Sequence, residues 1–312
     1  MNVLPGSSRF GVGAVAVSLM AFASALSPAS APAAQLMTQT LRDAPAIVIA
    51  AFGTSTKAQV TYEVFEKQLR ESLTGYEIRW AFTSEVIRER VNARRREEGR
   101  TDLLKSLPQA LADLQADGFT KVVVQPLHIF PGEEYEEVLA VTSKFPGLRL
   151  EVGETLLQRW ESLRHVVSVV SQDFLPPEQG CNVLVSHGTP STNVGSNITY
   201  LGLERHLART YPNVFLGAVE GVITPDDALE PAKACPGTRV RFVSLMYVAG
   251  DHLMSDVMGD ADSWKVAVES VGKVADTPTI EYEGETRTKG LGYYPEVNEI
   301  FIDSVRRALT RL

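Results

Sequence analysis

Short apolar runs alternate with amphipathic segments along most of the 312-residue chain. Apolar runs bounded by turn residues are typical of buried strands, and apolar residues at intervals of three and four are typical of helices. On these criteria, strands are predicted at 46–52, 76–82, 121–130, 148–153, 182–187, 213–219, 238–248 and 278–284. Helices are predicted between and after them, at 57–73, 85–98, 102–118, 134–144, 158–173, 197–209, 224–233, 254–270 and 295–311. Because strands and helices alternate, we predict an α/β fold with parallel sheets.

The two halves of the chain resemble each other in the same order of motifs. The matching segments are 48–54 (VIAAFGT) with 183–189 (VLVSHGT), 61–62 with 199–200 (both Thr-Tyr), and 126–134 (PLHIFPGEE) with 244–252 (SLMYVAGDH). An internal duplication explains the matches. The alternative is chance similarity between two generic βαβ units.

A connector rich in proline and glycine, 175–180, separates the two halves. We therefore predict two similar lobes, 46–175 and 181–312. Each lobe is expected to carry a parallel sheet flanked by helices, and the two lobes should face each other across a cleft.

The amino-terminal residues 1–31 have the features of a secretory signal peptide. Arg9 precedes an apolar run, 11–26, which is too short for a comfortable membrane span, and small residues at 29–34 offer cleavage sites. The alternative is an uncleaved anchor. No second apolar run is long enough to cross a bilayer, so we expect a periplasmic protein without a stable membrane span.

Composition narrows the class of partner. Hydrophobic residues make up 44% of the chain and charged residues 22%, as in globular proteins. The formal net charge of −8 argues against a general binder of nucleic acid or of anionic membranes. The chain has no P-loop and no Gly-x-Gly-x-x-Gly motif, so no nucleotide cofactor is predicted.

The chain has two cysteines, Cys181 and Cys235. Each precedes a predicted strand, so both could lie at the amino-terminal edge of neighbouring strands. Disulfides persist in oxidising compartments, and export would place the chain in one. A disulfide and two free thiols are the alternatives, and the spacing argues against a cysteine metal site.

Three polar side chains end predicted strands of the second half. His187 ends the first of these strands, Glu220 ends the second, and His252 follows the third after a glycine turn. Carboxyl ends of parallel strands meet at one edge of a sheet, where open α/β folds bind ligands. Two imidazoles and a carboxylate can bind a divalent transition metal and leave coordination positions open. Zinc-dependent hydrolysis and transfer of a metal to an acceptor both suit such a set.

Four motifs together resemble the class II cobaltochelatases of the anaerobic cobalamin pathway, which act on sirohydrochlorin and are relatives of the ferrochelatases. The motifs are Ala51-Phe-Gly-Thr-Ser55, His128-Ile-Phe-Pro-Gly-Glu-Glu-Tyr135, Ser186-His-Gly-Thr189 and Gly250-Asp-His252. The resemblance covers the chain from Ala46 to its end. It implies a two-lobed chelatase fold and insertion of a divalent metal, Co²⁺ or Fe²⁺, into a tetrapyrrole without ATP.

The resemblance also assigns roles to single residues. It places the metal on His187, Glu220 and His252. Two pyrrole N–H protons must leave as the metal enters, so His187 is the candidate for both metal contact and proton acceptance. Glu220 would supply charge and orientation, and His252 would be the third ligand.

The carboxylates of a tetrapyrrole need anchors. Backbone N–H groups at helix amino termini bind anions, so we expect seats at Gly53, Thr54 and Ser55 and at Gly188 and Thr189. Arg79, or an arginine within 88–96, could also pair with a carboxylate. The alternative for Arg94-Arg95-Arg96 is a solvated helix face balanced by Glu97 and Glu98.

His128 has no counterpart in the repeat, where Met246 takes its place. It is either a cleft residue that contacts tetrapyrrole or an axial ligand of a separately bound haem at a subunit interface. The charged region 85–117 is either a lid or a contact in a homo-oligomer. Export separates the chain from cytoplasmic corrin synthesis, so the alternative to an enzyme is a periplasmic carrier of metal or haem that reuses the fold. A metallohydrolase is a weaker third hypothesis.

Overall fold

The computed structural model describes residues 40–190 and 195–312, so the predicted signal peptide lies outside the described residues. In this part of the chain the strands form two four-stranded sheets and one two-stranded hairpin. The first sheet contains β1 (Ala46–Ala51), β2 (Glu77–Phe82), β3 (Lys121–Pro126) and β4 (Arg149–Val152). The second contains β5 (Gly180–Gly188), β6 (Val214–Glu220), β7 (Arg239–Ser244) and β8 (Val274–Asp276).

Both four-stranded sheets are parallel and have the same strand order. The first runs β2-β1-β3-β4 and the second runs β6-β5-β7-β8. The predicted α/β class and the parallel sheets are confirmed. The shared order is what an internal duplication would produce. In each sheet the chain order reverses beside the first strand, and ligands bind at the carboxyl ends of strands at such a point.

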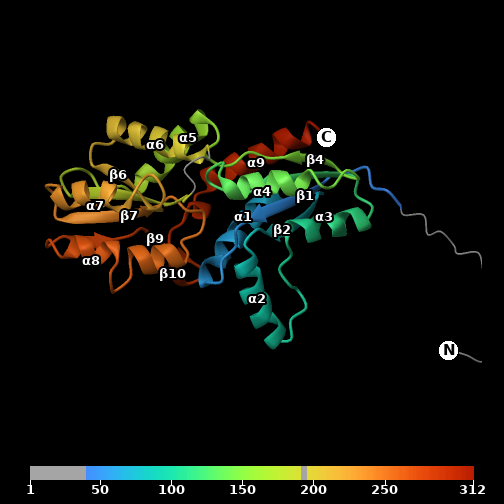
Figure 1. Ribbon diagram of the computed structural model, residues 1–312, viewed down its shortest axis with the longest axis horizontal. Coiled ribbons are helices and arrows are strands. Elements are labelled where there is room, and N and C mark those ends of the chain that lie inside the picture. The colour runs from blue at the N-terminus through green and yellow to red at the C-terminus, as the bar shows by residue number, and fades with distance from the viewer. Residues whose placement is uncertain (1–39, 191–194) are drawn as a thin grey trace, which may run out of the picture. The chain divides into compact units, whose positions relative to one another are not determined.

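Helices cover both sheets (Figure 1). The first half contains α1 (Val60–Ser72), α2 (Glu85–Glu97), α3 (Leu107–Ala116), α4 (Glu133–Thr142) and α5 (Trp160–Val170). The second half contains α6 (Ser196–Thr210), α7 (Pro225–Ala234), α8 (Trp264–Glu269) and α9 (Pro295–Leu309). Within residues 40–190 and 195–312, none of the helices is long and apolar enough to cross a membrane.

The two halves exchange helices. The terminal helix α9 packs against β3, β4, α1 and α5, so it covers the first sheet, although the chain enters it from the second half. In the opposite sense, Trp160 at the start of α5 contacts His206 of α6, with ring centroids 5.7 Å apart. The apolar face of α9 is buried against the first sheet, as is typical of an amphipathic helix.

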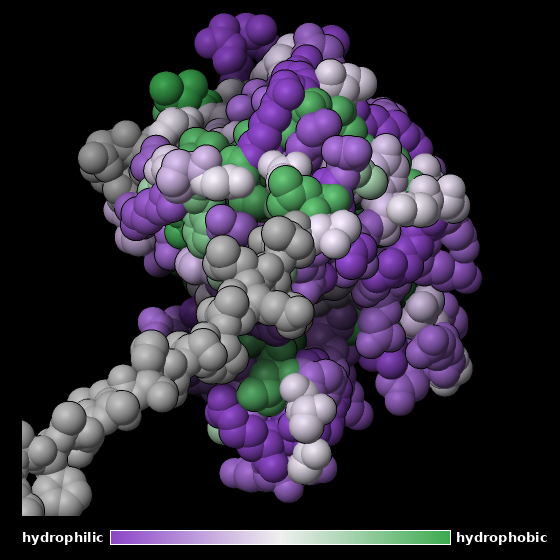
Figure 2. All heavy atoms as spheres, turned by 90° about the vertical axis from the view of Figure 1, so that its right-hand side faces the viewer, coloured by the Kyte–Doolittle hydropathy of each residue, from purple (hydrophilic) through white to green (hydrophobic). Residues whose placement is uncertain are grey.

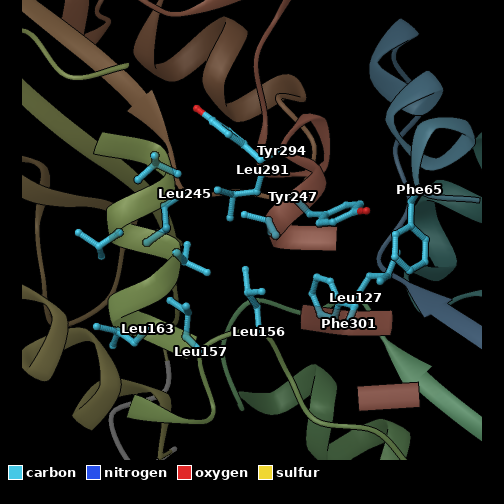
Figure 3. Close-up of a cluster of buried hydrophobic side chains, with 14 of the residues drawn as sticks. Phe65, Leu127, Leu156, Leu157, Leu163, Leu245, Tyr247, Leu291, Tyr294 and Phe301 are labelled. Atoms are coloured by element: carbon cyan, nitrogen blue, oxygen red, sulfur yellow. The ribbon is translucent and has the colours of Figure 1, made fainter. Parts of the chain in front are cut away.

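A hydrophobic core joins the two halves. It includes Phe65 and Leu127 from the first half and Leu245, Tyr247 and Phe301 from the second, all buried (Figure 3). Two smaller clusters fill the outer faces of the two sheets. Because the largest cluster draws on both halves, the described residues form one unit by their contacts.

The cysteines are joined by a disulfide. Cys181 lies in β5 and Cys235 follows α7, and their Cα atoms are 6.2 Å apart. Gly180 and Cys181 pair in register with Arg239 and Val240 at the start of β7. The expected placement at one edge of neighbouring strands is confirmed, and so is the disulfide of the two alternatives.

Several predicted elements differ from the structure for local reasons. The helix expected from Asp102 begins at Leu107, because Ser106 forms a capping box with Gln109. The strand expected at 278–284 is half of an antiparallel hairpin, β9 (Thr279–Tyr282) with β10 (Glu285–Thr288). The helix expected at 254–270 is split into a π-helical turn (Leu253–Val257) and α8, and the short strand β8 after it was missed.

Candidate active site

A pocket of about 410 Å³ opens at the carboxyl ends of the central strands of both sheets. Every residue predicted as a metal or haem ligand or as a backbone anchor lines it: Gly53, Thr54, Ser55, His128, His187, Gly188, Thr189, Glu220 and His252. The two arginine candidates differ in their location. Arg90 of the 88–96 run lines the pocket, whereas Arg79 pairs with Glu77 and Asp117 outside it.

Gly188 holds His187 and Glu220 side by side. Its φ of +87° is favourable only for glycine, and a Cβ atom there would lie 1.6 Å from the Glu220 carbonyl oxygen. Gly188 is paired in register with Glu220 at the end of β5 and β6. This close approach places Nδ1 of His187 3.5 Å from Oε1 of Glu220.

The Nδ1 atom of His187 faces two oxygens, because the Gly188 carbonyl oxygen also lies 3.2 Å away. Oxygen acceptors on Nδ1 favour the tautomer that carries its proton there. The lone pair of Nε2 is then free to bind a metal or to accept a proton. Glu220 contacts the ring through one carboxylate oxygen, so its second oxygen remains available.

His252 reaches the same place from β7. Its ring meets that of His187 edge to face, with centroids 4.7 Å apart. Nδ1 of His252 lies 2.7 Å from Oδ2 of Asp256, one turn later in the π-helical segment that follows His252. Such segments are frequent at functional sites. Asp256 therefore fixes the ring and leaves Nε2 as the ligand atom.

The three side chains gather at one place without forming a finished coordination shell. Within the described residues, no group of three or more histidine, cysteine, aspartate or glutamate side chains is arranged to hold a metal ion. The side chains of His187, Glu220 and His252 are each 42–48% exposed, so they are accessible from the pocket. Partial, accessible coordination suits a metal that is passed on more than one that is retained.

His128 faces the pocket from the first lobe. It is buried, and burial lowers the pKa of its imidazole to about 4. Nε2 of His128 lies 3.2 Å from Oε2 of Glu134, but this contact lacks hydrogen-bond geometry and both ring nitrogens have no hydrogen-bond partner. The ring is therefore neutral at pH 7.

Glu134 is a pocket residue that the sequence reasoning missed. Burial, reinforced by the neighbouring charge of Glu137, raises the pKa of its carboxyl to about 7. A signal was available, since Glu134 aligns with His252 in the repeat. The pocket thus has a proton-binding group on each lobe.

Two tyrosines that also line the pocket accept hydrogen bonds from the backbone N–H groups of its glycine turns. The Gly53 N–H donates to the Tyr62 hydroxyl at 3.2 Å, and the Gly188 N–H donates to the Tyr200 hydroxyl at 3.0 Å. These two N–H groups are therefore engaged within the protein. The repeated Thr-Tyr pairs at 61–62 and 199–200 are the sequence signal for this arrangement.

The model of the family described as "Cobalt chelatase (CbiK)" matches residues 45–310. The chain belongs to this family. It is 31% identical over 254 residues to the sirohydrochlorin cobaltochelatase CbiKC of Nitratidesulfovibrio vulgaris, which covers 76% of this chain and 85% of that protein. It is 28% identical over 271 residues to the sirohydrochlorin cobaltochelatase of Salmonella typhimurium, which covers 85% of this chain and 96% of that protein.

Solved structures support the same fold. SirB from Bacillus subtilis with Fe³⁺ matches with a TM-score of 0.57 at 15% identity, over 85% of this chain and 95% of that one. The sirohydrochlorin chelatase SirB in complex with cobalt, from a subspecies of the same organism, matches with a TM-score of 0.53 at 14% identity, over 86% and 96%. The predicted two-sheet chelatase fold and the predicted enzyme class are confirmed: this family member is a chelatase.

Proposed function

We propose that this chelatase inserts a divalent metal, Co²⁺ or Fe²⁺, into sirohydrochlorin or a similar tetrapyrrole, without ATP. One observation carries the proposal: the carboxyl ends of β5 and β6 and the segment that follows β7 bring His187, Glu220 and His252 into one accessible pocket that both halves of the chain line. Membership of the cobalt chelatase family and relatives named for sirohydrochlorin support the choice of metal and acceptor.

The incoming metal is the substrate and first meets the two imidazoles. Nε2 of His187 and Nε2 of His252 are the ligand atoms, because Nδ1 of each ring faces oxygen atoms of the protein. Glu220 offsets the charge of the cation with its free carboxylate oxygen. Weak, incomplete coordination by the protein favours transfer, since the four ring nitrogens of a tetrapyrrole bind the metal more completely.

Metal insertion releases two pyrrole protons, and the pocket supplies acceptors for them. His187 accepts a proton at Nε2 once the metal has left that atom. Glu134 faces the pocket from the other lobe, and a carboxyl with a pKa of about 7 releases and binds protons readily at neutral pH. His128 beside it stays neutral and limits the charge at this wall.

Metal insertion needs no nucleotide, because binding of the metal by the macrocycle drives the reaction. We also propose export through the signal peptide at 1–31, which rests on the sequence. The alternative role as a periplasmic carrier of haem would use His128 as an axial ligand. The burial of His128 in the wall of the pocket favours contact with the tetrapyrrole that the pocket receives.

Anaerobic turnover of the mature protein with sirohydrochlorin and Co²⁺ or Fe²⁺, followed by visible absorbance, tests the proposal. We expect multiple turnovers that fall at least about a hundredfold in His187→Ala and in His252→Ala. His165→Ala is the matched control, because His165 is exposed on α5 and does not line the pocket. Stoichiometric binding of metal or haem without turnover would contradict the enzyme and favour the carrier.

A further inference from the structure

The pocket has an uneven distribution of charge. Its wall carries the carboxylates of Glu133, Glu134, Glu220 and Asp251, but Arg90 is its one lysine or arginine among the residues described. No carboxylate of the described chain lies within ion-pair distance of Arg90. Arg90 differs in this respect from the nearby Arg95 and Arg100, which both form ion pairs with Asp102.

Arg90 points at the turn that follows β1. Its Nη1 donates to the hydroxyl of Ser55 at 3.4 Å, and Nη1 of Arg94, one helical turn later, donates to the carbonyl oxygen of Ser55 at 3.5 Å. Both contacts are at the long limit for hydrogen bonds, so they are weak. A carboxylate would replace them with shorter, charge-assisted bonds and could accept two from one guanidinium.

The base of α2 is fixed, which holds these two arginines in place. Arg88 donates to the carbonyl oxygens of Phe82 and Thr83. A Cβ atom on Gly53 would lie 3.0 Å from Ile87, so the turn and the helix are already in contact there. Figure 1 shows α2 reaching away from the sheets, which leaves Arg90 and Arg94 accessible to solvent and ligand.

We infer that Arg90, assisted by Arg94 and by the Ser55 hydroxyl, binds a peripheral carboxylate of the tetrapyrrole. The inference deepens the proposed function and rests on it for the identity of the ligand. A cation at the rim attracts a polycarboxylate toward a pocket whose interior is acidic and suited to a metal cation. Arg90 therefore determines specificity for tetrapyrroles that carry carboxylates, and it does not take part in metal transfer.

Steady-state kinetics with sirohydrochlorin and Co²⁺ test the assignment. In Arg90→Ala we expect KM for the tetrapyrrole to rise roughly tenfold or more, as for loss of a charge-assisted hydrogen bond, while kcat stays near the wild-type value. Arg90→Lys should recover part of the loss. Arg96→Ala is the matched control, since it removes the same charge from α2 at an exposed position with no contact to the pocket.

Binding of metal-free sirohydrochlorin, measured by fluorescence, separates this inference from the proposed function. If the wild type binds without turnover and Arg90→Ala binds at least tenfold more weakly, the inference stands and the chelatase proposal fails. Added salt should weaken wild-type binding more than Arg90→Ala binding. Equal dissociation constants for Arg90→Ala and Arg96→Ala would overturn the inference, whatever the turnover.

Discussion

His187 and His252 meet edge to face, with ring centroids 4.7 Å apart, although they are 65 positions apart in the sequence. His187 ends β5 and His252 follows β7, and these two strands are neighbours in the second sheet. The contact therefore follows from the strand order. It places two ligand atoms of the proposed metal site at the point where the chain order of the sheet reverses.

Asp256 should control how well His252 binds metal. Asp256→Asn removes the charge that accepts the Nδ1–H of His252 at 2.7 Å. Loss of such an outer partner costs about ten- to a hundredfold in metal affinity. We expect calorimetric titration with Co²⁺ to show a loss of this size.

Asp260→Asn is the control for that measurement, because the Asp260 side chain is fully exposed and forms an ion pair with Lys265 on the surface. Equal Co²⁺ affinity in the two variants would show that Asp256 does not support metal binding by His252.

Gly188 should be irreplaceable for a reason beyond its backbone angle. In Gly188→Ala the new Cβ would meet the Glu220 carbonyl oxygen at 1.6 Å, so β5 and β6 must separate where His187 and Glu220 lie. Gly284→Ala has a similar positive φ of +76° but nothing within 4 Å of its Cβ. We expect Gly284→Ala to cost about 1–2 kcal/mol of unfolding free energy. Gly188→Ala should cost clearly more in chemical denaturation and lose turnover even where it is folded.

His128 should make the protein less stable in acid. Its pKa is about 4 in the folded protein and near its ordinary 6.5 when unfolded, so the unfolded state binds more protons between these values. Stability is unaffected by this group above pH 6.5 and is lost as pH falls from 6.5 toward 4. At pH 4.5 the loss amounts to about 2–3 kcal/mol.

Urea unfolding of the wild type and of His128→Gln at pH 7 and 4.5 measures this contribution. We expect the difference in unfolding free energy between the two pH values to be smaller in His128→Gln. His165→Gln, at an exposed position, should keep the wild-type difference. If all three proteins lose the same amount, His128 is not the group responsible.

The disulfide should stabilise the fold by restricting the unfolded chain. Cys181 and Cys235 are 54 positions apart, and closing a loop of this length is worth about 4 kcal/mol in the chain-entropy model. Cys181→Ser with Cys235→Ser should lower the unfolding free energy by up to that amount. A reductant should lower the stability of the wild type and leave the double variant unchanged; an unchanged wild type would contradict the bond.

The sequence by itself determined the elements and the ligand candidates. Apolar runs that end in a polar residue marked β5 and β6, and their carboxyl ends share an edge in any parallel sheet. His187, Glu220 and His252 could therefore be placed together without coordinates. The repeat likewise indicated two equivalent sheets. These are short-range patterns, and the handedness of β-α-β units converts them into topology.

Tertiary structure alone decided which side chains of the two halves share the pocket. In the sequence, Glu134 is marked only by its alignment with His252 in the repeat, Arg90 is not distinguished from the other arginines of 88–96, and Asp256 carries no mark. An acidic or basic residue on a helix is usually solvated, so none of the three stands out by itself. Their roles follow from partial burial beside His128, from the turn at Ser55 and from a π-helical turn after His252. Such features arise when segments that are distant in the sequence pack together. Hydrophobic periodicity along the chain predicts helices and strands, but it does not predict which of them pack against each other.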